Sequence, residues 1–223
     1  MIHIPARRAG SATVLSLLVL ALGACGTSGA TSTGTASSPS APAPSPPAQA
    51  EAAASPVPDQ PFGAACGAIP AAGEGSFAGM SDDPVAVAMA NNPVVTALAA
   101  AIRAAHLAAP LDSQREVTVL APANLAFEHV PHDALGALLA DTPRLTAVLT
   151  HHVLQGRLAP EALAGTHTTL NNDQVTIDVS PDAFTVAAEG TLLGGTEARV
   201  ICGNMRTANA TVYLIDQVLA PPD

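Results

Sequence analysis

Two pairs of histidines have the residue type for metal binding or proton transfer. His151 and His152 are adjacent, and His129 lies three residues before His132. Adjacent residues on a strand point to opposite faces, so His151 and His152 are not expected to share a metal ion. Pro131 interrupts the helix that would have to bring His129 and His132 together, and the spacing is not that of H-E-x-x-H. We therefore expect no metal site, and solvated histidines at 129 and 132.

Motifs for catalysis are also absent from the sequence. There is no Gly-x-Ser-x-Gly elbow, no phosphate-binding loop and no specific pair of carboxylates. Asn209 opens an Asn-Ala-Thr sequon, which we interpret as a turn element between strands rather than as a glycosylation site. The sequence predicts no enzyme and no cofactor.

Cys25 is a candidate for lipid modification. It ends the sequence LGAC, after a short apolar run over residues 12–24 and the basic pair Arg7–Arg8. A spanning helix needs about 20 apolar residues, whereas a basic start, a short apolar run and small residues at its end are typical of a secretory signal peptide. LGAC resembles the bacterial lipobox, in which the thiol accepts a diacylglyceryl group. We predict a signal peptide over 1–24 and lipidation of Cys25; the alternatives are ordinary secretion and twin-arginine export.

The other two cysteines, Cys66 and Cys202, are candidates for a disulfide. An even pair of cysteines in a chain that leaves the reducing cytosol favours a disulfide, and the spacing excludes a CxxC redox or zinc motif. The alternative is two free buried thiols.

The charge balance limits the partners. The formal net charge is −10 at pH 7 and the chain has no lysine. This balance argues against nucleic acid and anionic membrane surfaces, because binding to both depends on neutralised phosphates. Four phenylalanines, one tyrosine and no tryptophan leave no platform for stacking sugars or bases. Membrane contact is expected through the N-terminal lipid only.

Composition divides the rest of the chain in two. Residues 25–61 are rich in Ala, Pro, Ser, Thr and Gly, so they are expected to form a disordered stalk. Residues 62–223 are long enough to bury one core. Helical patterns come first, with Ser81–Asp82 and Asn92 as expected caps, and alternating strand patterns follow. The expected helices are 81–92, 92–106, 132–141 and 142–152; the expected strands are 116–122, 174–179, 183–190, 197–201 and 211–219. This order predicts an α+β domain.

Three segments carry a resemblance to the fasciclin domain: TVLAPANLAFEHVP (118–131), LTHHVLQGRL (149–158) and NATVYLIDQVLAPP (209–222). The resemblance covers about residues 80–222. GMSDDPVAVAMANNP (79–93) and VICGNMRTANATVYLIDQVLAPP (200–222) are similar to the lipidated and secreted fasciclin antigens of mycobacteria. The resemblance to the fasciclin domain implies a single fasciclin-type domain, a two-sheet β wedge with a helical layer.

The family motifs also single out individual residues. Asn124 is expected to cap the short helix that carries Phe127 into the core. Asp216 interrupts an apolar strand, and His152 is its expected partner, because a buried unpaired carboxylate is costly. His151 stands where the family has a tyrosine, in a region connected with receptor binding in animal relatives. His151 and His152 are therefore binding candidates.

The predicted function follows from the anchor, the stalk and the domain. We expect a monomeric domain on the outer face of the cell membrane, with some release to the extracellular space. It would act in adhesion or protein recognition, with an unidentified cell-surface or host protein as partner, and as an antigen recognised by host immunity. The alternative is a carrier of a small apolar ligand at the cell envelope.

Overall fold

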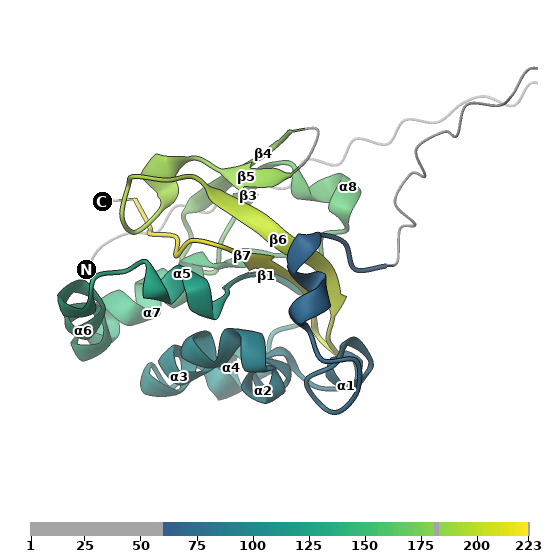
Figure 1. Ribbon diagram of the computed structural model, residues 1–223. Helices are drawn as coiled ribbons and strands as arrows, with labels where there is room; N and C mark the ends of the chain where they lie inside the picture. Colours follow the sequence, from purple (N-terminus) through teal and green to yellow (C-terminus); the bar gives the residue numbers. More distant parts are fainter. Residues whose placement is uncertain (1–59, 181–182, 223) are drawn as a thin grey trace, which may run out of the picture. The chain divides into compact units, whose positions relative to one another are not determined.

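The computed structural model describes residues 60–180 and 183–222 (Figure 1). The predicted signal peptide, Cys25 and nearly all of the predicted stalk lie outside the described residues.

Most helices of the described residues lie in the first half of the domain, and a few follow among the strands. Their bounds are η1 (Ala64–Ala68), α1 (Phe77–Ser81), α2 (Val85–Asn91), η2 (Pro93–Val95), α3 (Thr96–Ala104), α4 (Ala108–Asp112), α5 (Asn124–Glu128), α6 (His132–Ala140), α7 (Thr142–His151), α8 (Pro160–Leu163) and η3 (Ala188–Gly190). The four helices expected from the sequence are confirmed, although the first begins only after Pro84. Within the described residues no single helix is long and apolar enough to cross a membrane, and only α2 with Pro93–Ala104, bent by 96°, meets the length and composition criteria as a pair.

The start of α2 is capped from distant parts of the chain, not by Ser81–Asp82 as expected. Asn209 Oδ1 accepts a hydrogen bond from the backbone N–H of Val85 at 2.8 Å, and Asp112 Oδ1 accepts one from Ala86 at 2.8 Å. These bonds satisfy N–H groups that the first helical turn leaves free. The cap therefore depends on tertiary structure.

Seven strands of the described residues form one sheet. Their bounds are β1 (Val117–Pro122), β2 (Val153–Gln155), β3 (Gly165–Thr168), β4 (Gln174–Val179), β5 (Phe184–Val186), β6 (Ala198–Arg206) and β7 (Ala210–Ile215). The order across the sheet is β2-β1-β7-β6-β5-β4-β3. The β1–β7 pair is parallel and the other neighbouring pairs are antiparallel. The α+β class is confirmed.

The two expected sheets are the two halves of this one series of strands. The sheet curls, because Leu154 of β2 forms a bridge with Thr169, just after β3, and the Leu170 N–H donates to the carbonyl of Val153. Figure 1 shows α2, α3 and α4 on one side of β1, β6 and β7, and β3–β5 on the other. The result is a near-barrel with a helical layer outside it.

Strand β7 is buried on both faces and separates two apolar clusters. Val212 and Leu214 pack with the helices, whereas Tyr213 and Ile215 face the inside of the curl with Ile177 of β4. This alternation follows from the two-residue period of a strand. Val179, which the two-residue period of a strand places on the same face as Ile177, is 64% exposed because it ends β4 beyond this cluster.

A disulfide joins Cys66 of η1 to Cys202 of β6, as the cysteine count led us to expect. Beside it, Phe62 and Gly203 exchange two backbone hydrogen bonds. A Cβ atom on Gly203 would lie 2.6 Å from the Phe62 ring, so this crossing requires glycine. The beginning of the described chain is thus held against β6, across a separation of 136 residues.

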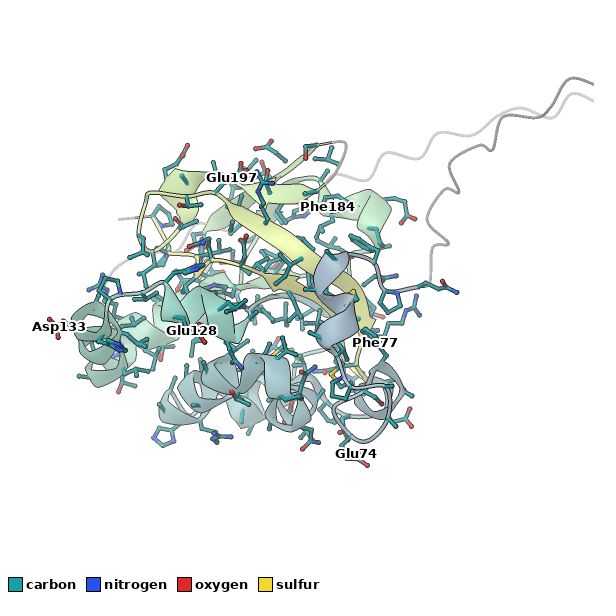
Figure 2. The ribbon with its side chains drawn as sticks, in the orientation of Figure 1. Glu74, Phe77, Glu128, Asp133, Phe184 and Glu197 are labelled. Atoms are coloured by element: carbon teal, nitrogen blue, oxygen red, sulfur yellow. A yellow bond between two sulfur atoms is a disulfide. The ribbon has the colours of Figure 1, made fainter. Side chains whose placement is uncertain are left out.

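Acidic side chains lie on the outside of the domain. Figure 2 shows Glu74, Asp133 and Glu197 at its periphery. Glu197 pairs with the guanidinium of Arg199, and both side chains are substantially exposed. These acidic side chains are therefore presented to solvent.

Candidate functional site

His151 and His152 lie at the end of helix α7, within the helix expected over 142–152, and not on a strand as the argument against a shared metal ion assumed. Pro143 in the first turn and the Asp141 side chain, which accepts a hydrogen bond from the Arg144 N–H, start this helix. His151 is its last residue, and β2 begins directly after His152. The two residues are 3% and 2% exposed, so neither offers a protein partner an open surface.

His151 is held by a carboxylate that the sequence analysis did not identify. Its Nδ1 atom lies 2.7 Å from Oδ1 of Asp173. Asp173 also accepts hydrogen bonds from the Thr169 hydroxyl and from Nδ2 of Asn171. Burial by itself raises the pKa of Asp173, but these hydrogen bonds and the one from His151 outweigh it and hold the pKa below its ordinary value. Asp173 is therefore a carboxylate at neutral pH, and His151 donates its Nδ1 proton to it.

His152 serves a different purpose, because both of its ring nitrogens bind backbone groups. Nδ1 donates to the carbonyl of Val148 at 2.7 Å, and Nε2 accepts the N–H of Leu219 at 2.9 Å. Burial lowers the pKa of His152 to about 4, opposed by the bond to Val148 and assisted by the nearby His151. The neutral ring thus joins α7 to the C-terminal segment.

The expected pairing of His152 with Asp216 is wrong. Asp216 is half-buried, and its Oδ1 accepts the backbone N–H of Arg199 at 2.7 Å. The carboxylate therefore binds the neighbouring strand β6, while the hydrogen-bonding capacity of His152 is already used. Asp216 contributes to strand pairing and not to a site with the histidines.

Asn124 is a cap, but for a different helix. Ala123, not Asn124, precedes the first turn of α5, and Asn124 Oδ1 accepts the N–H of Ala97 in the first turn of α3 at 3.0 Å. Its Nδ2 donates to the carbonyl of Pro93. Phe127 is half-buried and packs against the larger apolar cluster, as expected.

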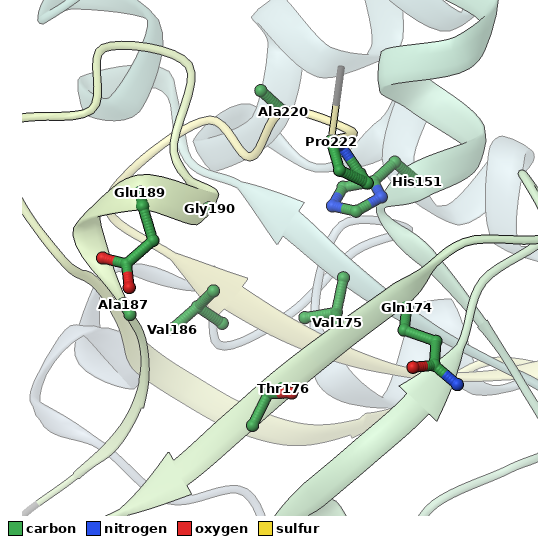
Figure 3. A pocket seen from close by; sticks show the side chains of 10 residues that line it. All are labelled: His151, Gln174, Val175, Thr176, Val186, Ala187, Glu189, Gly190, Ala220 and Pro222. Carbon is green, nitrogen blue, oxygen red and sulfur yellow. The ribbon is translucent and has the colours of Figure 1, made fainter.

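A hollow of about 310 Å³ opens beside His151 (Figure 3). We call it the His151 hollow. Val175 and Val186 belong to the cluster inside the curled sheet, so the hollow lies at the mouth of the near-barrel. Figure 3 shows the His151 ring and the Glu189 carboxylate on opposite sides of these two valines. The full lining is His151, Gln174, Val175, Thr176, Val186, Ala187, Glu189, Gly190, Ala220 and Pro222.

The sequence analysis missed Asp173 and Glu189 for physical reasons. Asp173 lies in the polar turn TLNNDQ, which could have been identified as a turn, but no sequence spacing relates it to His151, 22 residues earlier. Glu189 belongs to the short helix η3, in a segment that we expected to be a strand. Asp173 contacts His151, and Glu189 lines the hollow beside it, only in the folded sheet.

The other histidines and the acidic residues form no metal centre in residues 60–180 and 183–222, where no group of three or more His, Cys, Asp or Glu side chains is placed to hold an ion. His129 and His132 are exposed, and His129 Nδ1 lies 3.3 Å from Nε2 of Gln217. Asn209 is engaged as a structural group: its Nδ2 donates to the carbonyls of Leu111 and Gln114.

Comparisons with known proteins agree with this fold. Residues 93–221 match the fasciclin domain model. The chain is 35% identical over 230 residues to the cell surface glycolipoprotein MPB83 of Mycobacterium bovis, with 100% of this chain and 99% of that protein covered. It is 41% identical over 155 residues to the immunogenic protein MPT70 of Mycobacterium tuberculosis, covering 67% of this chain and 75% of the relative.

A solved structure of the FAS1 domain pair from the insect cell adhesion molecule fasciclin I has a similar fold. The TM-score is 0.51 at 13% identity, over 63% of this chain and 52% of that one. The chain thus spans about half of that domain pair. Taken with the family match and the full-length similarity to MPB83, the curled sheet and its helical layer establish that this chain belongs to the fasciclin-domain family.

Proposed function

We propose that this protein is a lipid-anchored fasciclin domain that recognises a protein partner at the cell surface. The observation that carries the proposal is the 35% identity to a cell surface glycolipoprotein over the whole of both chains, leader and stalk regions included. The LGAC sequence at Cys25 supplies the anchor in this proposal. Two or three acyl chains, at about 0.8 kcal/mol for each buried CH₂, would hold the chain firmly to the membrane.

The described domain suits display away from the membrane. Its disulfide and its caps between distant segments favour a single rigid shape, and a rigid surface reduces the entropy lost on binding. Its acidic exterior favours a partner with a basic or neutral surface. The proposed role needs no catalysis and no cofactor. A second relative is named an immunogenic protein, which supports recognition of the displayed or released domain by host immunity.

The anchor is tested by comparing the wild-type chain with Cys25→Ser. Wild type should partition into detergent with the membrane fraction, and mass spectrometry should find an acylated N-terminal Cys25. Cys25→Ser should leave the membrane fraction while the disulfide stays intact. Equal membrane retention of both chains would contradict lipid anchoring at Cys25.

The partner is tested by photo-crosslinking on intact cells. Photoreactive residues are placed one at a time at Leu125 on α5 and Val179 on β4, which are 58% and 64% exposed. A surface partner should give a discrete crosslinked band from at least one of these positions, and excess unlabelled protein should compete with it. The buried Leu120, 1% exposed, is the matched negative position. Equal, non-competable crosslinking at all three positions would contradict specific recognition.

A further inference from the structure

We propose that the His151 hollow is a binding site for a small molecule with an apolar body and a hydroxyl group that donates a hydrogen bond to Nε2 of His151. This proposal is independent of protein recognition at the outer surface. It rests on three properties of the hollow: its position, its polar atoms and their charge.

The hollow lies at a position in the fold where small-molecule sites are common. The mouth of a barrel is a common place for one, and a volume of about 310 Å³ lies at the lower end of the range for small-molecule sites. Val175 and Val186 form its floor, and Ala187, Ala220 and Pro222 add further apolar surface. These five residues favour an apolar body, which would lie beside the polar groups His151, Gln174, Thr176 and Glu189 of the lining.

The histidine supplies a directed polar contact. The side chain of His151 is 4% exposed, and its Nδ1 is engaged by Asp173. Nε2 makes no hydrogen bond with any group in the described part of the chain. Every fully buried polar side-chain atom in that part has a hydrogen-bond partner, so Nε2 is not fully buried. Nε2 therefore reaches the hollow, at the end of a ring that Asp173 keeps in one orientation.

The proton on Nδ1 of His151 determines whether Nε2 accepts or donates a hydrogen bond, and so which ligand can bind. Because Nδ1 of His151 donates its proton to Asp173, the tautomer with a free lone pair on Nε2 presents a hydrogen-bond acceptor to the hollow. Glu189, across the hollow, is also an acceptor and carries a negative charge. Glu189 and the acidic net charge disfavour carboxylates and phosphates, although Gln174 and Thr176 of the lining can also donate, and the Nε2 acceptor favours a ligand that donates a hydrogen bond. An apolar alcohol or phenol meets these conditions.

The test compares two probes of nearly the same shape, 4-propylphenol and its methyl ether, 4-propylanisole. The protein is the exported chain with Cys25→Ser, which needs no detergent that would compete for an apolar probe. Binding is followed by the methyl NMR signals of Val175 and Val186. The phenol should shift these signals and bind about tenfold more tightly than the ether, because only the phenol has a proton to donate.

Three variants locate the interaction. His151→Phe keeps an aromatic ring and should bind both probes alike, with the affinity for the phenol reduced about tenfold. Ala187→Leu, at an exposed position on the rim, should fill the hollow and prevent binding of both probes. His129→Ala removes an exposed histidine outside the lining and should change neither affinity.

Several results would overturn the site. These are no shift of Val175 or Val186 with either probe, equal affinities of wild type for phenol and ether, or unchanged binding in Ala187→Leu. If His151→Phe fails to fold, the comparison of the two probes and the Ala187→Leu variant still decide. Cell-surface crosslinking at Leu125 or Val179 is independent of these outcomes, so failure of this site and failure of protein recognition are distinguishable.

Discussion

The adjacent residues His151 and His152 have different roles because their ring nitrogens have different hydrogen-bond partners. His152 binds backbone on both sides and joins α7 to the C-terminal segment. His151 binds Asp173 on one side and reaches the hollow on the other. A residue type alone therefore does not assign a role, and the two positions call for separate experiments.

His152 should make the fold sensitive to acid. The pKa is about 4 in the folded chain against 6.5 for the free side chain, so the unfolded chain takes up a proton first as the pH falls. The stability contributed by the neutral ring is complete above pH 6.5 and is lost progressively down to pH 4, by about 3 kcal/mol at most. Urea unfolding across this range measures the loss, and NMR titration of the ring measures the midpoint. A midpoint of 6.5 in the folded protein would contradict the account.

Asp173→Ala should lower the free energy of unfolding by about 1–3 kcal/mol, because three donors from Thr169, Asn171 and His151 lose their acceptor. Asp178→Ala, an exposed carboxylate on β4, is the matched control and should change it by less than about 0.5 kcal/mol. Chemical denaturation at pH 7 compares the two. Equal effects would mean that the Asp173 network does not stabilise the fold.

At the scale of elements, sequence reasoning succeeded where the cause is local. The strand over 116–122 and the helices over 132–141 and 142–152 follow from periodicity and from residues such as Pro143. It failed where a side chain serves another element: Asn124 caps α3, 27 residues earlier, and Asn209 caps α2, 124 residues earlier. Asp173 was missed for the same reason. Such contacts are fixed by the tertiary fold and have no signature in spacing.

Asn209 holds several elements together, so Asn209→Ala should be costly. The change removes the acceptor for the Val85 N–H and the donor for carbonyls at Leu111 and Gln114. We expect a loss of about 2–3 kcal/mol in the free energy of unfolding, from a lost helix cap and unpaired backbone groups. Thermal unfolding measures the loss. Asn91→Ala, at an exposed residue, is the control and should lower the free energy of unfolding by less than about 0.5 kcal/mol in the same assay. A small effect of Asn209→Ala would contradict the role of this cap.

At the scale of the whole molecule, the family motifs and the even pair of cysteines were sufficient to anticipate the domain, its α+β class and the Cys66–Cys202 pair. They were not sufficient to anticipate how the two expected sheets join into one curled series of strands, because the bridge between Leu154 and Thr169 links strands that are separate in sequence. That closure creates the mouth at which the His151 hollow lies.

The disulfide should carry a large part of the stability of the domain. It closes a loop of 136 residues, for which the chain-entropy model gives about 5 kcal/mol as an upper figure. Cys66→Ser/Cys202→Ser should unfold at a much lower denaturant concentration, whereas Cys25→Ser, which keeps the disulfide, should unfold like the wild-type domain. An unchanged midpoint in the double variant would show that the fold does not depend on this bond.

The central claim, recognition of a surface protein, is tested most directly by equilibrium binding of the labelled Cys25→Ser chain to intact cells, before and after those cells are treated with protease. Bacterial cells of the same kind and animal cells are compared. The account predicts saturable binding to at least one of them, competition by unlabelled chain, and loss of binding after protease treatment. Binding to neither, or uptake that rises linearly and survives protease, would contradict it.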